Sequence, residues 1–126
     1  MKLSKRLETI VEQAALVCGG ETAADVGTDH GFVPIRLIEE GAADRVIAMD
    51  VRKGPLMRAQ EHVIQFGMEE QIETRLSDGL EKLMPGEAKT VIIAGMGGEL
   101  MLRCRVFWKK DGRMVSLKIS LTLCSV

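Results

Sequence analysis

The sequence predicts a single doubly wound α/β domain of 126 residues, and three observations lead to this fold class. Segments with apolar residues at helical spacing alternate with short apolar runs that are typical of buried parallel strands. Glycine and proline residues separate these segments by short connections. Four predicted strands end on acidic or glycine residues. Because crossovers between parallel strands are right-handed, we expect helices on both faces of the sheet.

Each element follows from its local pattern. Apolar residues from Leu3 to Ala15 recur at helical spacing until Gly19-Gly20 stops the pattern, and Pro55 suits the first turn of a later helix. The tail alternates apolar and polar residues, which is typical of a strand. The expected helices cover residues 4–17, 32–39 and 55–66, with a further helix starting near Glu99, and the expected strands cover residues 22–26, 45–50, 72–76, 90–94 and 115–123.

Composition excludes several classes of protein. Apolar residues make up 46% and charged residues 28%, as in ordinary globular domains, and no apolar run approaches the 18 residues of a membrane span. Three dispersed cysteines and two histidines argue against a structural zinc site, so we expect no metal and a reducing, cytoplasmic location. The net charge of −1 and the 3% aromatic content favour neither nucleic acid nor membranes.

The average charge hides a division of the chain. Residues 1–102 hold 11 basic and 17 acidic side chains, a net charge of −6, whereas residues 103–126 hold six basic side chains and one acid, a net charge of +5. Such asymmetry indicates either a basic arm or a segment foreign to the preceding domain. We therefore expect residues 1–102 to form the α/β domain part and residues 103–126 to form an atypical basic, β-patterned tail.

Candidate ligand-binding residues lie where the predicted strands end, which is where open α/β sheets bind ligands. Gly27 allows close approach of a ligand to the backbone, and Asp50 is placed to accept hydrogen bonds from two ribose hydroxyls. Asp78 and the N–H of Gly79 suit an adenine ring. The whole set comprises Asp25, Gly27, Asp29, His30 and Gly31, then Asp50, then Asp78 and Gly79, and finally Gly95, Met96, Gly97 and Gly98.

Each of these motifs also has an ordinary structural interpretation, as a turn, a strand-end cap or a hydrogen-bonded histidine. Their occurrence at four strand ends in one chain favours a nucleotide-like ligand. A dinucleotide loop needs glycine where Asp29 stands, and a carboxylate repels a pyrophosphate. A phosphate-free ligand with a ribose, an adenine and a cationic centre fits better, and S-adenosylmethionine has all three.

Four stretches resemble the bacterial tRNA (adenine(22)-N1)-methyltransferase family: LSKRLETIV, ADVGTDHGFVPIRLIEEG, SDGLEKLMPGE and TVIIAGMGGELM. The resemblance covers about residues 1–102. It implies a Rossmann-like class I methyltransferase sheet with S-adenosylmethionine as cofactor and tRNA as substrate. The implied cofactor-binding residues are Asp25, Gly27, Asp50, Asp78, Gly79, Gly95, Met96 and Gly97.

The implied reaction is in-line attack of adenine N1 on the methyl group. Because N1 carries a lone pair at neutral pH, the reaction needs alignment, exclusion of water and an acceptor for the developing positive charge. Asp29 is the candidate for stabilising that charge or accepting a proton from the exocyclic amine. His30 is the candidate for orienting Asp29 or contacting RNA.

The tail departs from the family pattern, since such enzymes continue with further strands and a helical extension. We expect a sheet truncated after the fourth strand, by an early or frame-shifted end or by divergence. The strand over residues 115–123 would then cover the open edge of the fourth strand, within the chain or in a homodimer. Alternative interpretations are a non-catalytic S-adenosylmethionine-binding fragment, a nicotinamide-dependent oxidoreductase and a structural interaction domain.

Overall fold

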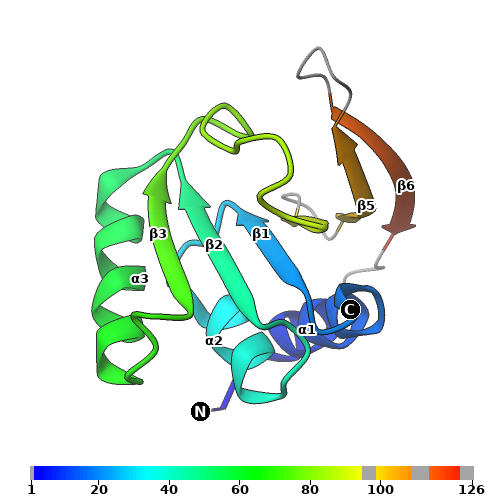
Figure 1. Ribbon diagram of the computed structural model, residues 1–126. Helices are drawn as coiled ribbons and strands as arrows, with labels where there is room; N and C mark the ends of the chain where they lie inside the picture. Colours follow the sequence, from blue (N-terminus) through cyan, green and yellow to red (C-terminus); the bar gives the residue numbers. More distant parts are fainter. Residues whose placement is uncertain (1, 95–98, 109–113, 123–126) are drawn as a thin grey trace.

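The structure is a computed structural model that describes residues 2–94, 99–108 and 114–122. Within these described residues, three helices and six strands follow one another (Figure 1). They are α1 (Lys5–Cys18), β1 (Thr22–Val26), α2 (Phe32–Glu39), β2 (Arg45–Asp50), α3 (Lys53–Gln65), β3 (Ile72–Leu76), β4 (Thr90–Ala94), β5 (Glu99–Trp108) and β6 (Met114–Thr122).

One six-stranded sheet in the order β3-β2-β1-β4-β5-β6 organises the molecule. The four strands from β3 to β4 are parallel, so the predicted α/β class with a parallel, Rossmann-like sheet is confirmed. Because the chain moves outward from β1 to β3 and then returns to β4 on the other side of β1, the strand order reverses beside β1. In open parallel sheets this reversal is the usual place for a ligand.

Local sequence explains where the helices begin and end. The Ser4 side chain accepts a hydrogen bond from the Leu7 backbone N–H at 3.3 Å and so caps the N-terminus of α1. Gly19 ends this helix in the left-handed region, with φ of 59°. The buried face of α1 follows the predicted helical spacing, with Ile10, Val11, Ala14 and Cys18.

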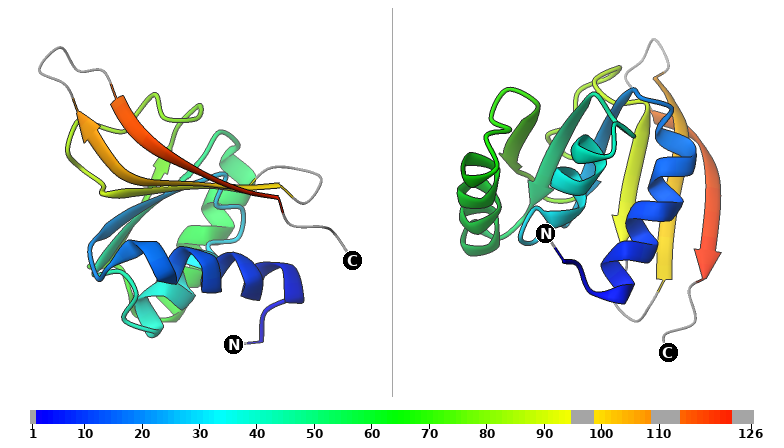
Figure 2. Two further views of the ribbon diagram at one scale, coloured as in Figure 1. Left: turned by 90° about the vertical axis from the view of Figure 1, so that its right-hand side faces the viewer. Right: turned by 90° about the horizontal axis from the view of Figure 1, so that it is seen from below.

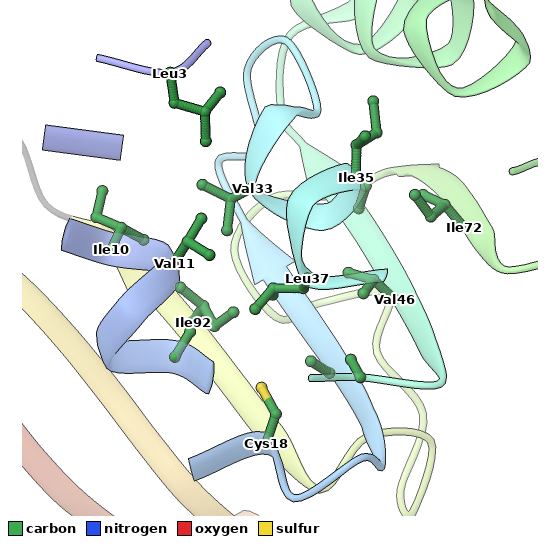
Figure 3. Packing of buried hydrophobic residues seen from close by; sticks show 14 of the residues in the cluster. Leu3, Ile10, Val11, Cys18, Val33, Ile35, Leu37, Val46, Ile72 and Ile92 are labelled. Carbon is green, nitrogen blue, oxygen red and sulfur yellow. The ribbon is translucent and has the colours of Figure 1, made fainter. Parts of the chain in front are cut away.

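The two faces of the sheet are covered differently. All three helices pack on one face, as the edge-on view shows (Figure 2). Fully buried residues such as Ile35, Leu37, Val46 and Ile92 join them to the strands (Figure 3). Alternate strand residues point to the other face, where Leu83 and Ala88 of the loop between β3 and β4 cover them. In the described part of the chain, the helices therefore lie on one face and a loop covers the other, whereas helices were expected on both faces. The reason is that both crossovers leading from β1 to β3 move outward in the same direction, and right-handed crossovers of this kind place their helices on the same face.

The residues after β4 depart from the prediction. Glu99 was expected to begin a helix, but it begins β5, which pairs with β4 in antiparallel fashion. The strand expected over 115–123 is present as β6. It was expected to pair with β4, but it pairs with β5, and β5 covers the edge of β4. The physical reason is the edge of β4, whose backbone groups need partners that a helix at Glu99 would not supply.

None of the three described helices combines the length and the apolar character needed to cross a membrane.

Candidate functional site

The carboxyl ends of β1, β2 and β3 meet at one edge of the sheet. The Thr28 backbone N–H donates to the Met49 carbonyl at 2.8 Å, which joins the loop after β1 to β2. The Ser77 N–H donates to the Asp50 carbonyl at 2.9 Å, which joins the loop after β3 to the end of β2. The sequence-predicted residues that these contacts bring to the same edge are Asp25, Gly27, Asp29, His30, Asp50, Asp78 and Gly79.

Asp50 lies at the centre of this edge, and its side chain is only 3% exposed. One carboxylate oxygen accepts the Asp29 backbone N–H at 3.0 Å, and the other accepts the Arg52 backbone N–H at 3.0 Å. A carboxylate has about four acceptor positions, and Arg52 Nε lies 3.7 Å from Oδ1, too far for a hydrogen bond, so the hydrogen bonds of the described residues leave one position on each oxygen. Asp50 therefore fastens the loop after β1 while keeping the capacity to bind two hydroxyl groups.

The loop over residues 27–31 contains three residues with positive φ: Gly27 at 72°, Asp29 at 57° and Gly31 at 77°. Asp29 is the sole non-glycine residue of this kind in the described part of the chain. Aspartate tolerates this region better than most residues, which explains how it replaces glycine here. A Cβ at Gly31 would lie 3.0 Å from the Cβ of Ala59, so this glycine lets α2 begin close against α3.

Asp25 is a buried carboxylate, 4% exposed, near the end of β1. Burial raises the pKa of Asp25 from 3.8 to about 7, and the negative charge of Asp50 adds to the rise. The nearby Thr28 hydroxyl lowers the pKa of Asp25 and so offsets part of this rise. Thr28 Oγ1 is itself buried, and among the described residues it has no hydrogen bond of ordinary geometry. An acid with this pKa at a strand end is typical of functional sites, because simple structural carboxylates avoid such burial.

The side chains of Asp29 and His30 are more accessible, with exposed fractions of 58% and 41%. His30 Nε2 lies 3.9 Å from Asp29 Oδ1, and Arg52 Nη2 lies 3.9 Å from the same oxygen. These separations are too long for hydrogen bonds, and exposed ion pairs of this kind stabilise a protein by less than about 1 kcal/mol. The Asp29 carboxylate is therefore held only loosely and is open to a ligand.

His62 of α3 supports the loop from the side. Its Nδ1 atom lies 2.7 Å from the His30 carbonyl oxygen, so Nδ1 carries the proton that it donates. The His62 ring also stacks on Phe32, with 4.8 Å between the ring centroids, and meets the His30 ring edge-on at 6.1 Å. Contacts across 32 residues of sequence thus fix the backbone that carries His30.

Asp78 and Gly79 follow β3 in a turn. Asp78 is exposed, its carbonyl accepts the Glu81 N–H at 3.2 Å, and Gly79 has a φ of 59°. Gly95, Met96, Gly97 and Gly98, which belong to the predicted set of candidate residues, lie outside the described residues.

Sequence reasoning assigned no role to Thr28, Arg52, His62, Arg75 or Ser77, which all contact this edge or the loop beside it. Thr28 and Ser77 stand within the motifs, and a hydroxyl next to a strand-end acid was the available signal. Arg52, His62 and Arg75 carried no local signal. Within the described residues, no three His, Cys, Asp or Glu side chains are grouped so as to hold a metal ion.

Comparison with known proteins agrees with this geometry. Residues 3–116 match the family described as "Methyltransferase domain". The chain is 39% identical over 101 residues to the tRNA (adenine(22)-N(1))-methyltransferase of Bacillus subtilis (strain 168). This match covers 80% of the chain and 41% of that relative, so the chain spans less than half the length of the enzyme it resembles.

Solved structures show the same likeness. The crystal structure of the B. subtilis m1A22 tRNA methyltransferase matches with a TM-score of 0.69 and 39% identity, over 77% of this chain and 40% of that one. A Streptococcus pneumoniae protein in complex with S-adenosyl-L-methionine matches with a TM-score of 0.68 and 36% identity, over 77% of this chain and 44% of that one.

Proposed function

The chain belongs to the methyltransferase-domain family, and we propose that it binds S-adenosyl-L-methionine as the cofactor-binding part of a tRNA (adenine(22)-N1)-methyltransferase. The observation that carries the proposal is the convergence of Asp25, Asp29 and Asp50 at the edge where the strand order reverses. Three carboxylates favour a ligand with hydroxyl and cationic groups over one with phosphates. The likeness to a tRNA methyltransferase over 101 residues supports the choice of reaction.

The described residues fit this cofactor in charge and in hydrogen bonding. The free acceptor positions of Asp50 suit the two ribose hydroxyls, and the Asp25 carboxylate with the neighbouring buried Thr28 hydroxyl suits the amino acid end of the ligand. Asp78 would accept a hydrogen bond from the adenine amino group, and the Gly79 N–H would bind a ring nitrogen. Gly27 would admit the ligand close to the backbone, and we keep Gly95, Met96 and Gly97 as proposed neighbours of the transferred group.

The bound cofactor would supply an electrophilic methyl group to adenine N1. Asp29 would either stabilise the positive charge that the base acquires or accept a proton from its exocyclic amine, which removes that charge. Its exposure and its loose ion pairs with His30 and Arg52 support this role, because a general base must reach the substrate. His30 would orient Asp29 or contact the RNA.

A second candidate is a protein that binds the cofactor without turning it over. The observation that favours it is that the residues assigned above, Asp29 and His30 apart, would all contact the proposed cofactor, and the match covers 41% of the related methyltransferase. Residues 1–102 would then carry the cofactor site, and residues 103–126 would form a tail of different origin. The difference in net charge supports this boundary, although β5 (Glu99–Trp108) extends across it. A nicotinamide-dependent oxidoreductase is not favoured, because the Asp29 carboxylate occupies the loop where a pyrophosphate would bind.

Two measurements separate these proposals. Calorimetry with S-adenosylhomocysteine tests cofactor binding, which Asp50→Ala is expected to weaken by at least about 10-fold through lost hydrogen bonds. Glu70→Gln is the matched control and should bind normally, because Glu70 precedes β3 at the amino ends of the strands, away from the proposed site. Transfer of labelled methyl groups to tRNA tests the reaction, with a tRNA that has guanine at position 22 as the negative substrate. Binding with no transfer supports the second candidate, and absence of binding contradicts both.

We also propose that the chain forms a homodimer through β6. This strand lies at the edge of the sheet and offers nine residues of backbone to a second copy. Light scattering at increasing concentration should show twice the mass of 13.8 kDa, and a constant monomer mass would refute the dimer. A cytoplasmic location also stays a proposal, in line with a tRNA substrate.

A further inference from the structure

The Ser77 side chain organises the turn that follows β3. Ser77 is 5% exposed, and its hydroxyl donates to the Gly79 carbonyl at 2.9 Å. The same oxygen accepts the Lys82 backbone N–H at 3.1 Å. The hydroxyl thus connects the residue before the Asp78–Gly79 segment with two backbone groups of the turn. Its one proton and one of its lone pairs are used in these two hydrogen bonds.

Arg75 holds the same segment from the other side. Its guanidinium donates to the Lys82 carbonyl at 2.8 Å and makes a two-pronged contact with Glu87 at 2.8 and 2.9 Å, with Glu73 as a further partner. These hydrogen bonds hold the pKa of Glu87 below its usual range. The Lys82 N–H therefore donates to Ser77 and the Lys82 carbonyl accepts from Arg75, so the position of the backbone at the end of the turn is fixed.

We propose that Ser77 is a positioning residue that sets the preference of this site for adenine by aiming Asp78 and Gly79. The inference rests on the proposed function, in which these two residues contact the adenine ring. Asp78 is exposed, and the direction of its segment depends on the bond that Ser77 makes to the Gly79 carbonyl. Without that bond the carboxylate and the Gly79 N–H lose their fixed relation, although the rest of the site is unchanged.

A plain turn-stabilising role for Ser77 makes a different prediction. If the hydroxyl merely stabilises the fold, its loss weakens the binding of every ligand of this site by the same factor. If it aims the adenine contacts, its loss weakens adenine ligands more than ligands with another base. The ratio of two affinities therefore separates the two roles, whereas either affinity alone does not.

The test compares S-adenosylhomocysteine with its inosine counterpart, which carries an oxygen in place of the adenine amino group. The wild-type protein should prefer the adenosine form by about 10- to 100-fold, because the oxygen cannot donate to Asp78 and a hydrogen bond to a charged group is lost. In Ser77→Ala this preference should fall by about 10-fold. An equal loss of affinity for both ligands, or an unchanged preference, would overturn the inference.

Control variants keep these outcomes distinct. Ser77→Cys preserves the size of the side chain but weakens its hydrogen bonds, so it should show the same loss of preference even if Ser77→Ala does not fold. Thr9→Ala removes a hydroxyl that donates to the Lys5 carbonyl within α1, and it should keep the wild-type preference. If the wild-type protein binds neither ligand, the proposed function itself fails. If it binds the adenosine form with the expected preference and both Ser77 variants keep that preference, only the role of Ser77 fails.

Discussion

Replacing Asp25 with asparagine should make the protein more stable at neutral pH, although it removes a residue from the proposed site. Asparagine has nearly the same shape and no charge, so the substitution removes the cost of burying a carboxylate. Asp25 is 4% exposed, and besides this burial the negative charge of the Asp50 carboxylate raises its pKa.

The size of the effect follows from the pKa of Asp25, which burial raises from 3.8 to about 7. Between these values the folded protein keeps a proton that the unfolded chain releases. The free energy of unfolding therefore falls as the pH rises from about 4 to about 7, and it is level above that range. A difference of about three pKa units corresponds to roughly 4 kcal/mol, which is the upper limit of the effect.

The assay is urea denaturation followed by circular dichroism at several pH values between 4.5 and 7.5. Near pH 4.5 the wild type and Asp25→Asn should have similar stability. At pH 7.5 the variant should be more stable, by up to about 4 kcal/mol. Other titrating groups are common to both proteins, so they cancel in the difference, and Glu70→Gln should show no such trend.

A difference that stays constant across this pH range would refute the reasoning, as would a wild type that is more stable than the variant at pH 7.5. The first result would mean that Asp25 is ionised in the folded protein throughout, and the second that the contacts of the carboxylate outweigh the cost of burying it. The confirmed trend would mean that the chain keeps a carboxylate at a cost to its stability, which is typical of residues retained for binding or catalysis.

Three further predictions concern strain and packing. Asp29→Ala should lower the free energy of unfolding by about 1 kcal/mol because of the φ of 57°, whereas Asp29→Asn should change it by less than about 0.5 kcal/mol; thermal melts compare the two. Gly31→Ala should lower the free energy of unfolding by about 2–3 kcal/mol in urea denaturation, because the new Cβ would lie 3.0 Å from the Cβ of Ala59. Gly41→Ala is the control, since Gly41 has a φ of 69° and no atom near its Cβ position, and it should lower the free energy of unfolding by about 1 kcal/mol. Leu37→Ala, at a fully buried position, should lower the free energy of unfolding by about 2–5 kcal/mol, and an unchanged urea midpoint would contradict the burial of Leu37 in the core.

Much of the fold was predictable because it depends on short-range pattern. The predicted bounds of β1, α2 and β4 coincide with those in the structure, since each element is a mainly apolar segment bounded by glycine or charged residues. The prediction failed after β4. The local sequence predicted a helix starting at Glu99, but these residues form β5, which pairs with the edge of β4. Because that edge exists only once the sheet has formed, the local sequence could not indicate this pairing.

The candidate site divides in the same way. The residue types that could bind a nucleoside-like ligand were evident at the strand ends, because parallel strands bring their carboxyl ends together. The contacts that fix these residues were not evident. Asp29 is fastened to Asp50 across 21 residues, and His62 holds the His30 carbonyl across 32.

The sequence alone determined the alternation of helices and strands, and with it the edge at which the acidic and glycine residues gather. Only the tertiary structure decided the burial that gives Asp25 its high pKa, the left-handed backbone at Asp29 and the hydrogen bonds through which Ser77 and Arg75 hold the turn after β3. The physical reason is range. Periodicity and turn chemistry act over a few residues, whereas desolvation, ion pairs and side-chain hydrogen bonds depend on which distant residues the fold places together.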